Sequence, residues 1–359
     1  MKFTADMGKA AFIFTTDYEI FGNGSGCLEK CMIEPTDRMA AILESANAKL
    51  TIFLDVCEFW AFEEEYAKGN LKEDWSGLIR SQLQRLVYRG HDVQLHFHPQ
   101  WLDYTFNRSS WRLNFDLWRI GKLPYQSAEH PNRGLDKLFA RGKKTLEDMI
   151  RPINPDYRCE VFRAGAWSIQ PEAEVLKAMT KNGFKVDSTV APGLKFTDKY
   201  THYDFSSAPI DKPHYKIAQE VTKENKNGQL LEVPIFTHNV SIMRKLYFQA
   251  LKKIKGLEMR PRGCKGSAMA TLNKSKFQKI KDVIGQERTM FTYSDAISSE
   301  EMIYFARRAI KLAAQRGEAT PIVAISHPKS FANERELEKL MKWLVRQENV
   351  TFSNYKLVL

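Results

Sequence analysis

Two histidines, His96 and His98, end an apolar run that reads HDVQLHFH over residues 91–98. Alternate residues of an extended strand face the same side, roughly 6.6 Å apart along it. Two imidazoles at that spacing can converge on one divalent ion, with nitrogen–metal distances of about 2.0–2.1 Å. A carboxylate from a neighbouring strand would complete a two-histidine, one-acid site with a position left for water. The pair alone is a weak signal, because two ordinary surface or core histidines can show the same spacing.

Two acids are placed to supply that carboxylate. Asp17 and Glu19 follow AAFIFTT, residues 10–16, so they end a buried strand rather than stand in a solvated loop. One can be the metal ligand and the other the general base, and the residues alone leave the assignment open.

Two further side chains end later apolar runs. Arg163, in VFRAGAWS, precedes two small residues that allow close backbone approach. A buried arginine needs an anionic partner, so Arg163 holds a catalytic carboxylate, a substrate or a structural salt bridge. His327, directly before Pro328, is either a general acid opposite the metal or a loop histidine.

Together these residue types suit the hydrolysis of an amide. A bound divalent metal lowers the pKa of water from 15.7 to about 7 and polarises the carbonyl oxygen. A carboxylate can then take the water proton, and a histidine can protonate the leaving amine.

The candidate residues require a scaffold that brings distant strand ends together. Seven short apolar, β-branched runs alternate with segments of 3.6-residue periodicity, which predicts a parallel α/β sheet, open or closed into a barrel. The runs are residues 10–16, 49–56, 91–98, 159–165, 183–189, 230–236 and 321–327, and the helical segments are 36–48, 74–89, 135–150, 171–182 and 298–316. Ser298 and Glu301 form a capping-box signature at the start of the last helix. All six candidates follow or end such runs, where parallel α/β folds bind their ligands, and residues 100–134 and 196–226 are predicted to be long loops.

In chain order, four segments resemble the motifs of the NodB-type polysaccharide deacetylases. The family's Thr-Phe-Asp-Asp motif is similar to residues 15–19 (TTDYE), and its histidine motif ending in His-Pro is similar to residues 90–99 (GHDVQLHFHP). Its Phe-Arg-Pro-Pro motif is similar to residues 162–165 (FRAG), and its late histidine motif to residues 325–328 (ISHP). The combination is specific although each motif alone is not. It also resembles a subgroup associated with lipopolysaccharide and surface-glycan biosynthesis.

The resemblance implies a distorted (β/α)7 barrel of the NodB type with long loop insertions, as one catalytic domain over residues 1–359. It implies Asp17 as base, Arg163 as partner of the base, and His327 as general acid. It implies His96 and His98 as ligands of a divalent metal, for which we expect Zn²⁺. The sequence departs from the family in two ways: the metal histidines are two rather than four residues apart, with Gln100 at the usual second position, and Tyr18 replaces the second Asp. We therefore assign the third ligand to Glu19; the alternative is Asp17 as the ligand, with the base unassigned.

The composition of the chain limits the cellular compartment and the binding partners that can be expected. The 359 residues carry a formal net charge of +11, with 54 basic and 43 acidic side chains. Five cysteines without a Cys-x-x-Cys pair predict neither a disulfide framework nor a thiolate zinc site. The start MKFTADMGKAAFIFTTDYE does not match a signal peptide, and no apolar stretch is long enough to span a bilayer. We predict a cytoplasmic protein, with peripheral contact at the inner face of the membrane as the sharper alternative.

Most of the positive charge lies between residues 244 and 288, which hold 13 Lys/Arg against 3 Asp/Glu. Ile242, Leu246 and Ile254 recur at helical spacing there, which predicts a basic helical insertion at about residues 240–290. Its lysines form a solvated face or a surface for anionic lipid or a lipid-linked glycan; those considered are Lys245, Lys252, Lys253 and Lys255. No nucleic-acid-binding motif accompanies the charge, so nucleic acid is not expected as a partner.

The function predicted from these features is metal-dependent removal of an N-acetyl group from an acetamido sugar. A nucleotide- or lipid-linked precursor of surface polysaccharide is the expected substrate. The alternatives are hydrolysis of a small cyclic amide and a non-catalytic, glycan-binding descendant of the same fold.

Overall fold

The computed structural model describes residues 8–107, 110–267 and 287–359. They form two compact units built from interleaved stretches of chain. The first unit comprises Met1–Thr16, Gly26–Leu50 and Ile235–Leu359, and the second comprises Asp17–Ser25 and Thr51–Pro234. That residues 1–359 act as one catalytic domain stays a prediction.

The first unit is organised around its buried N-terminal strand. Its strands are β1 (Ala10–Tyr18), which ends in the second unit, β12 (Thr237–Asn239), β13 (Arg288–Met290), β14 (Thr320–Ser326) and β15 (Val350–Phe352). β14 runs parallel to β1, from Ala10 opposite Thr320 to Thr16 opposite Ser326, and β15 also pairs with β1 in parallel. Its core includes Phe12, Phe14, Phe291 and Phe305.

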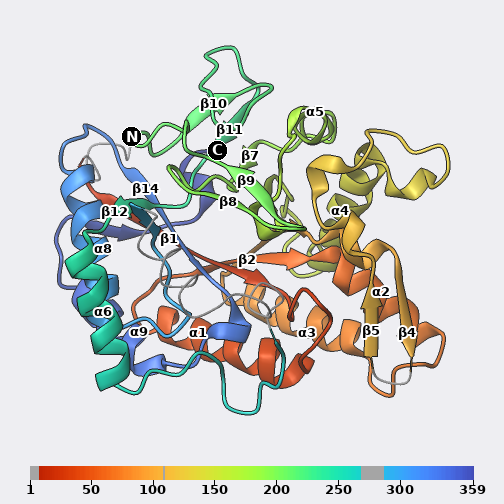
Figure 1. Ribbon diagram of the computed structural model, residues 1–359, viewed down its shortest axis with the longest axis horizontal. Coiled ribbons are helices and arrows are strands. Elements are labelled where there is room, and N and C mark those ends of the chain that lie inside the picture. The colour runs from red at the N-terminus through yellow and green to blue at the C-terminus, as the bar shows by residue number, and fades with distance from the viewer. Residues whose placement is uncertain (1–7, 108–109, 268–286) are drawn as a thin grey trace. The chain divides into compact units, whose positions relative to one another are not determined.

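Among its described residues, the first unit contains the helices α1 (Glu34–Glu44), α6 (Ile242–Ile254), α8 (Ser299–Ala313) and α9 (Glu334–Leu344), which Figure 1 labels. The predicted cap of α8 is confirmed, since the Ser298 hydroxyl accepts a hydrogen bond from the Glu301 backbone N–H.

The second unit contains the other predicted strand–helix alternation. Its strands are β2 (Leu50–Asp55), which begins at the last residue of the first unit, β3 (Asp92–Phe97), β4 (Tyr104–Asn107), β5 (Ser110–Leu113), β6 (Val161–Ala164), β7 (Val186–Asp187), β8 (Lys195–Thr197), β9 (His202–Asp204), β10 (Tyr215–Ile217) and β11 (Leu230–Glu232). Its helices are α2 (Val56–Ala67), α3 (Trp75–Tyr88), α4 (Leu135–Ile150) and α5 (Ala173–Lys181). Strands β2, β3, β6, β7 and β11 pair in that order and in parallel, and β10 adds an antiparallel edge. Parallel strands with helices in their connections confirm the predicted α/β class.

All seven predicted runs contain strands, and all five predicted helical segments contain helices. Two helices were missed: α2, which begins directly after the last residue of β2, and α9. The predicted loops hold short antiparallel hairpins, β4–β5 in the first and β8–β9 in the second.

Helix α6 confirms a helix in the basic segment but not its predicted orientation; residues 268–286 of that segment lie outside the described residues. Lys245 is buried, whereas the apolar Ile242 and Leu246 are about half exposed. The reason lies on α8 and α9, whose acids attract the lysines: Lys255 Nζ lies 2.6 Å from Glu300 Oε2. Lys252 and Lys255 therefore face acids of α8 and α9, whereas Lys253 is exposed. Contact of the lysines with an anionic lipid surface stays a prediction.

The cysteines also differ from the prediction. Cys31 and Cys264, both in the first unit, form a disulfide with their Cα atoms 5.0 Å apart. They are 233 residues apart in sequence, so no short spacing motif could have indicated the pair. The predicted cytoplasmic location stays a prediction.

Across the described ranges, no helix is both long enough and apolar enough to cross a bilayer.

Candidate active site

Three of the predicted residues converge in the second unit. His98 Nε2 lies 2.6 Å from Glu19 Oε2, and His96 Nε2 lies 3.6 Å from the same oxygen. All three side chains are buried, and one donor atom from each lies within 4.8 Å of the others. Two imidazoles and a carboxylate are a donor set that Zn²⁺ accepts.

The chain around Glu19 is held by helices of the same unit. The backbone N–H of Ile20 donates to both carboxylate oxygens of Glu58 on α2, each at 3.2 Å. The hydroxyl of Tyr18 donates to Gln82 on α3. These three bonds hold the residues on either side of Glu19.

His96 shows most directly that a cation fits. Its Nδ1 lies 2.8 Å from the carbonyl oxygen of Arg163, which can only accept, so Nδ1 carries the proton and Nε2 presents a bare lone pair. Among the described residues, that buried Nε2 has no hydrogen-bond partner. A buried acceptor facing a carboxylate oxygen is unfavourable unless a cation lies between them.

His98 has the opposite ring protonation in this structure. The Gln100 side-chain nitrogen donates to His98 Nδ1 at 3.2 Å and to the carbonyl oxygen of Gly22 at 3.2 Å. Nδ1 is therefore the acceptor, and Nε2–H donates to Glu19. A metal on Nε2 would replace that proton and move it to Nδ1. Gln100 Oε1, buried without a partner among the described residues, could then accept it after a half-turn of the amide.

Asp55 is a site residue that was not predicted from the sequence. It ends β2 and lies opposite His96 in the register, and His96 lies opposite Arg163 on β6. Asp55 Oδ1 accepts the backbone N–H groups of His98, at 3.1 Å, and Cys57, at 3.0 Å, so it also caps α2. Burial raises the pKa of Asp55 to about 7, with the negative charge of Glu19 adding to the increase and His98 opposing it. Its position at the carboxyl end of an apolar strand was the signal that could have identified it.

Asp17 forms an ion pair with Arg163. Arg163 is fully buried, and its Nη1 donates to Asp17 Oδ1 at 2.8 Å. Its Nε donates to the Ser188 carbonyl oxygen at 2.9 Å, and its guanidinium lies 4.1 Å from the centre of the Phe53 ring. Of the three roles considered for Arg163, the geometry shows the pairing with a carboxylate.

A second acidic pair, Asp187 and Glu232, lies opposite each other on β7 and β11 and was also missed. Burial raises the pKa of Asp187 to about 6. Burial also raises the pKa of Glu232, and the charge of Asp187 adds to that increase. A proton held by Glu232 could therefore be shared with Asp187, which also accepts from Thr189 Oγ1 at 2.6 Å.

The small residues after Arg163 are required by the site. A Cβ at Gly165 would lie 2.4 Å from the Phe97 carbonyl oxygen and 2.8 Å from the His98 ring. The next two residues, Ala166 and Trp167, have φ angles of 49° and 54°, in the left-handed region that non-glycine residues rarely adopt. The buried indole N–H of Trp167 has no partner among the described residues. Two consecutive strained residues beside a site are often part of ligand binding.

His327, the sixth predicted residue, belongs to the first unit and directly follows β14. Its backbone N–H donates to Ser294 Oγ at 3.2 Å. The assignment of His327 as general acid stays a prediction.

Comparisons with known proteins give structural neighbours only. No family model matches the sequence, and no curated protein matches it. A Mycobacterium smegmatis protein assigned provisionally as a polysaccharide deacetylase is 15% identical, with a TM-score of 0.45 over 98% of this chain and 89% of the other. An allantoinase is 11% identical, with a TM-score of 0.43 over 97% and 88%. The catalytic domain of a peptidoglycan N-acetylglucosamine deacetylase from Eubacterium rectale is 12% identical, with a TM-score of 0.38 over 98% and 92%. Values of this size do not place the chain in a family.

Proposed function

We propose that this protein is a metal-dependent amidohydrolase that removes an N-acetyl group from an amino sugar. The observation that carries the proposal is the unpartnered Nε2 of His96, buried beside Glu19 and His98. Hydrolysis of an unactivated amide needs a stronger nucleophile than free water and a polarised carbonyl, and a bound divalent metal supplies both.

Glu19, His96 and His98 would hold the ion. An ion on His98 Nε2 would displace the proton now shared with Glu19 to Nδ1, and the Gln100 side-chain oxygen could then accept a hydrogen bond from Nδ1–H. Asp55 positions this set through its bond to the His98 backbone, because that bond fixes the chain at the end of β3.

Asp17 is the general base in this proposal. Its contact with Arg163 stabilises the ionised carboxylate, which buried surroundings would otherwise disfavour, so the group can accept a proton from water. Asp17 pairs with Arg163, whereas Glu19 contacts His96 and His98. This difference supports Asp17 as the general base and Glu19 as the metal ligand. His327 is assigned as the acid that protonates the leaving amine.

The acetamido sugar as substrate follows from the motif resemblance described above, and a nucleotide- or lipid-linked precursor of surface polysaccharide is the class we propose. Trp167 adds a physical argument, since its unpartnered indole N–H can donate to a polar group of the substrate.

The test is acetate release by the purified full chain, reconstituted with Zn²⁺, from a panel of free, nucleotide-linked and lipid-linked acetamido sugars. A panel of small cyclic amides is run beside it. Turnover of a sugar that chelation abolishes and zinc restores is the expected result. Hydrolysis of cyclic amides alone would support the other hydrolase. Full zinc occupancy with no turnover of either panel would support a binding protein.

A further inference from the structure

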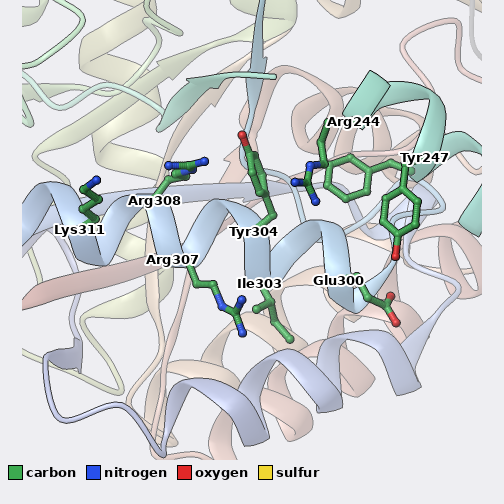
Figure 2. A pocket seen from close by; sticks show the side chains of 9 residues that line it. Arg244, Tyr247, Glu300, Ile303, Tyr304, Arg307, Arg308 and Lys311 are labelled. Carbon is green, nitrogen blue, oxygen red and sulfur yellow. The ribbon is translucent and has the colours of Figure 1, made fainter. Parts of the chain in front are cut away.

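The first unit contains a cationic, aromatic groove between α6 and α8. The groove has a volume of about 550 Å³, and its lining residues come from both helices. Figure 2 shows the Tyr304 ring between the side chains of Arg244 and Arg308, with Lys311 further along α8. Each guanidinium carbon lies 5.2 Å from the centre of that ring. An adjoining hollow of about 690 Å³ shares Arg244, Tyr304 and Arg308 and extends the groove toward His238.

In the part of the chain that the structure describes, no carboxylate neutralises the positive charge of this groove. Within the described ranges, no carboxylate forms an ion pair with Arg244, Arg308 or Lys311. Glu300, the acid that lines the groove, is already paired with Lys255. The three cations therefore form an uncompensated group.

The same positive charges act on His238. Burial lowers the pKa of His238, and the positive charges of Arg308 and Arg288 lower it further. Because His238 packs against Tyr304, with ring centres 6.0 Å apart, the positive field extends across the groove. Such a field favours an anionic ligand.

Helix α6, which carries Arg244, also carries exposed apolar side chains, and two of them, Ile242 and Tyr247, line the groove or the adjoining hollow. On α6, Ile242 is 50% exposed, Met243 76%, Leu246 52% and Tyr247 48%. Exposed apolar side chains would not contribute to binding a soluble anion. At a bilayer surface, an anionic headgroup layer lies next to a hydrocarbon layer, so cations and apolar side chains can both be bound there.

We propose that the groove between α6 and α8 docks the protein on an anionic lipid surface. The cations receive a lipid phosphate, and Ile242, Met243 and Leu246 enter the interface beside it. This places the contact on arginines of two helices rather than on Lys252 and Lys255, which pair with acids of α8 and α9. The inference does not depend on the proposed hydrolase activity.

The experiment is sedimentation of the full chain with vesicles of phosphatidylcholine alone or mixed with phosphatidylserine. We expect binding to the mixed vesicles only, weakened by salt. The double variant Arg244→Gln/Arg308→Gln should bind them about thirtyfold more weakly, since each cation near such a surface contributes about fivefold. Leu246→Asn should weaken binding without changing its dependence on phosphatidylserine.

The matched control is Lys185→Gln/Lys216→Gln, which removes the same net charge from exposed positions of the second unit and should bind as the unaltered chain does. Thermal unfolding of each variant verifies that it folds. Equal binding to phosphatidylcholine alone, or equal loss in the control, would overturn the proposal. Binding of soluble pyrophosphate, measured by calorimetry, without sedimentation on any vesicle would also overturn it, in favour of a soluble phosphate ligand.

Discussion

The second unit buries two acidic clusters on its parallel strands, and they differ in what satisfies them. Asp187 Oδ2 and Glu232 Oε2 have no partner among the described residues, and one proton shared by the two carboxyl groups would satisfy both. Near Glu19, the unpartnered atoms include His96 Nε2, whose lone pair faces a carboxylate oxygen. The comparison shows that burial and charge do not by themselves indicate a metal site. A metal site is indicated when two hydrogen-bond acceptors face each other and no proton is available to lie between them, because such a pair needs a cation.

The largest expected effect comes from removing a ligand of the His96–His98 cluster. His98→Ala should weaken zinc binding by at least about a hundredfold, because a lost ligand should cost no less than a lost outer-shell partner. Elemental analysis of the dialysed protein measures the effect, and circular dichroism checks the fold. Full zinc occupancy in this variant would mean that the His96–His98 cluster is no more a metal site than the Asp187–Glu232 pair.

The next effect separates Asp17 from Glu19. Asp17→Asn should keep zinc and lose on the order of 10²–10⁴ in acetate release, the usual share of a proton-transfer residue. Glu19→Gln should instead lose zinc. Metal content and turnover of both variants decide the matter, and the reverse pattern would exchange the two roles.

A smaller effect is expected at Asp55, which touches the His98 backbone. Asp55→Asn should lower zinc affinity about 10–100-fold while leaving the site able to fill at high zinc concentration. Competition with a chelator of known affinity gives the number. Cys57→Ser is a useful comparison, since it changes a neighbour of Asp55 that supplies only its backbone N–H to the carboxylate. If the Asp55→Asn variant bound zinc as tightly as the unaltered chain, Asp55 would serve only as the N-terminal cap of α2.

The smallest effect concerns Asp187 and Glu232. The raised pKa of Glu232 means that the folded state keeps a proton that the unfolded state has lost, so stability falls as pH rises above about 4.5 toward that raised pKa. Glu232→Gln keeps a donor to Asp187 but does not titrate. Its free energy of unfolding in urea should therefore fall less steeply between pH 5 and 8, by at most about 1.4 kcal/mol per pH unit. Zinc content should not change, and parallel pH slopes in the two proteins would contradict the shared proton.

Much of the second unit's cluster follows from one rule applied to the sequence. Polar residues at the ends of apolar runs led to Asp17, Glu19, His96, His98 and Arg163, and the structure places all five in one unit. Asp55 obeys the same rule but was overlooked because α2 begins at the next residue, without a turn signal. Asp187 and Glu232 lie within apolar runs, and an acid in such a run signals a buried partner that the sequence does not name.

The orientation of α6 could not be predicted from its own residues. Apolar side chains at helical spacing usually face the core, but here Lys255 turns inward toward Glu300 and Glu336. Those acids lie 45 and 81 residues away along the chain, so no local pattern reveals them. Ion pairs with neighbouring helices therefore determine which side of α6 faces inward.

The pairing of β1 with β14 also has a consequence for the order of events during synthesis. The Thr15 hydroxyl donates to the carbonyl oxygen of Ala324, a partner 309 residues further along. A ribosome adding about 5–20 residues per second makes that partner roughly 15–60 s later. The strand that leads into Asp17 and Glu19 must therefore wait, apolar and unpaired on that edge, until most of the chain has emerged. A nascent chain of this kind is a natural client for a chaperone that shields an early strand.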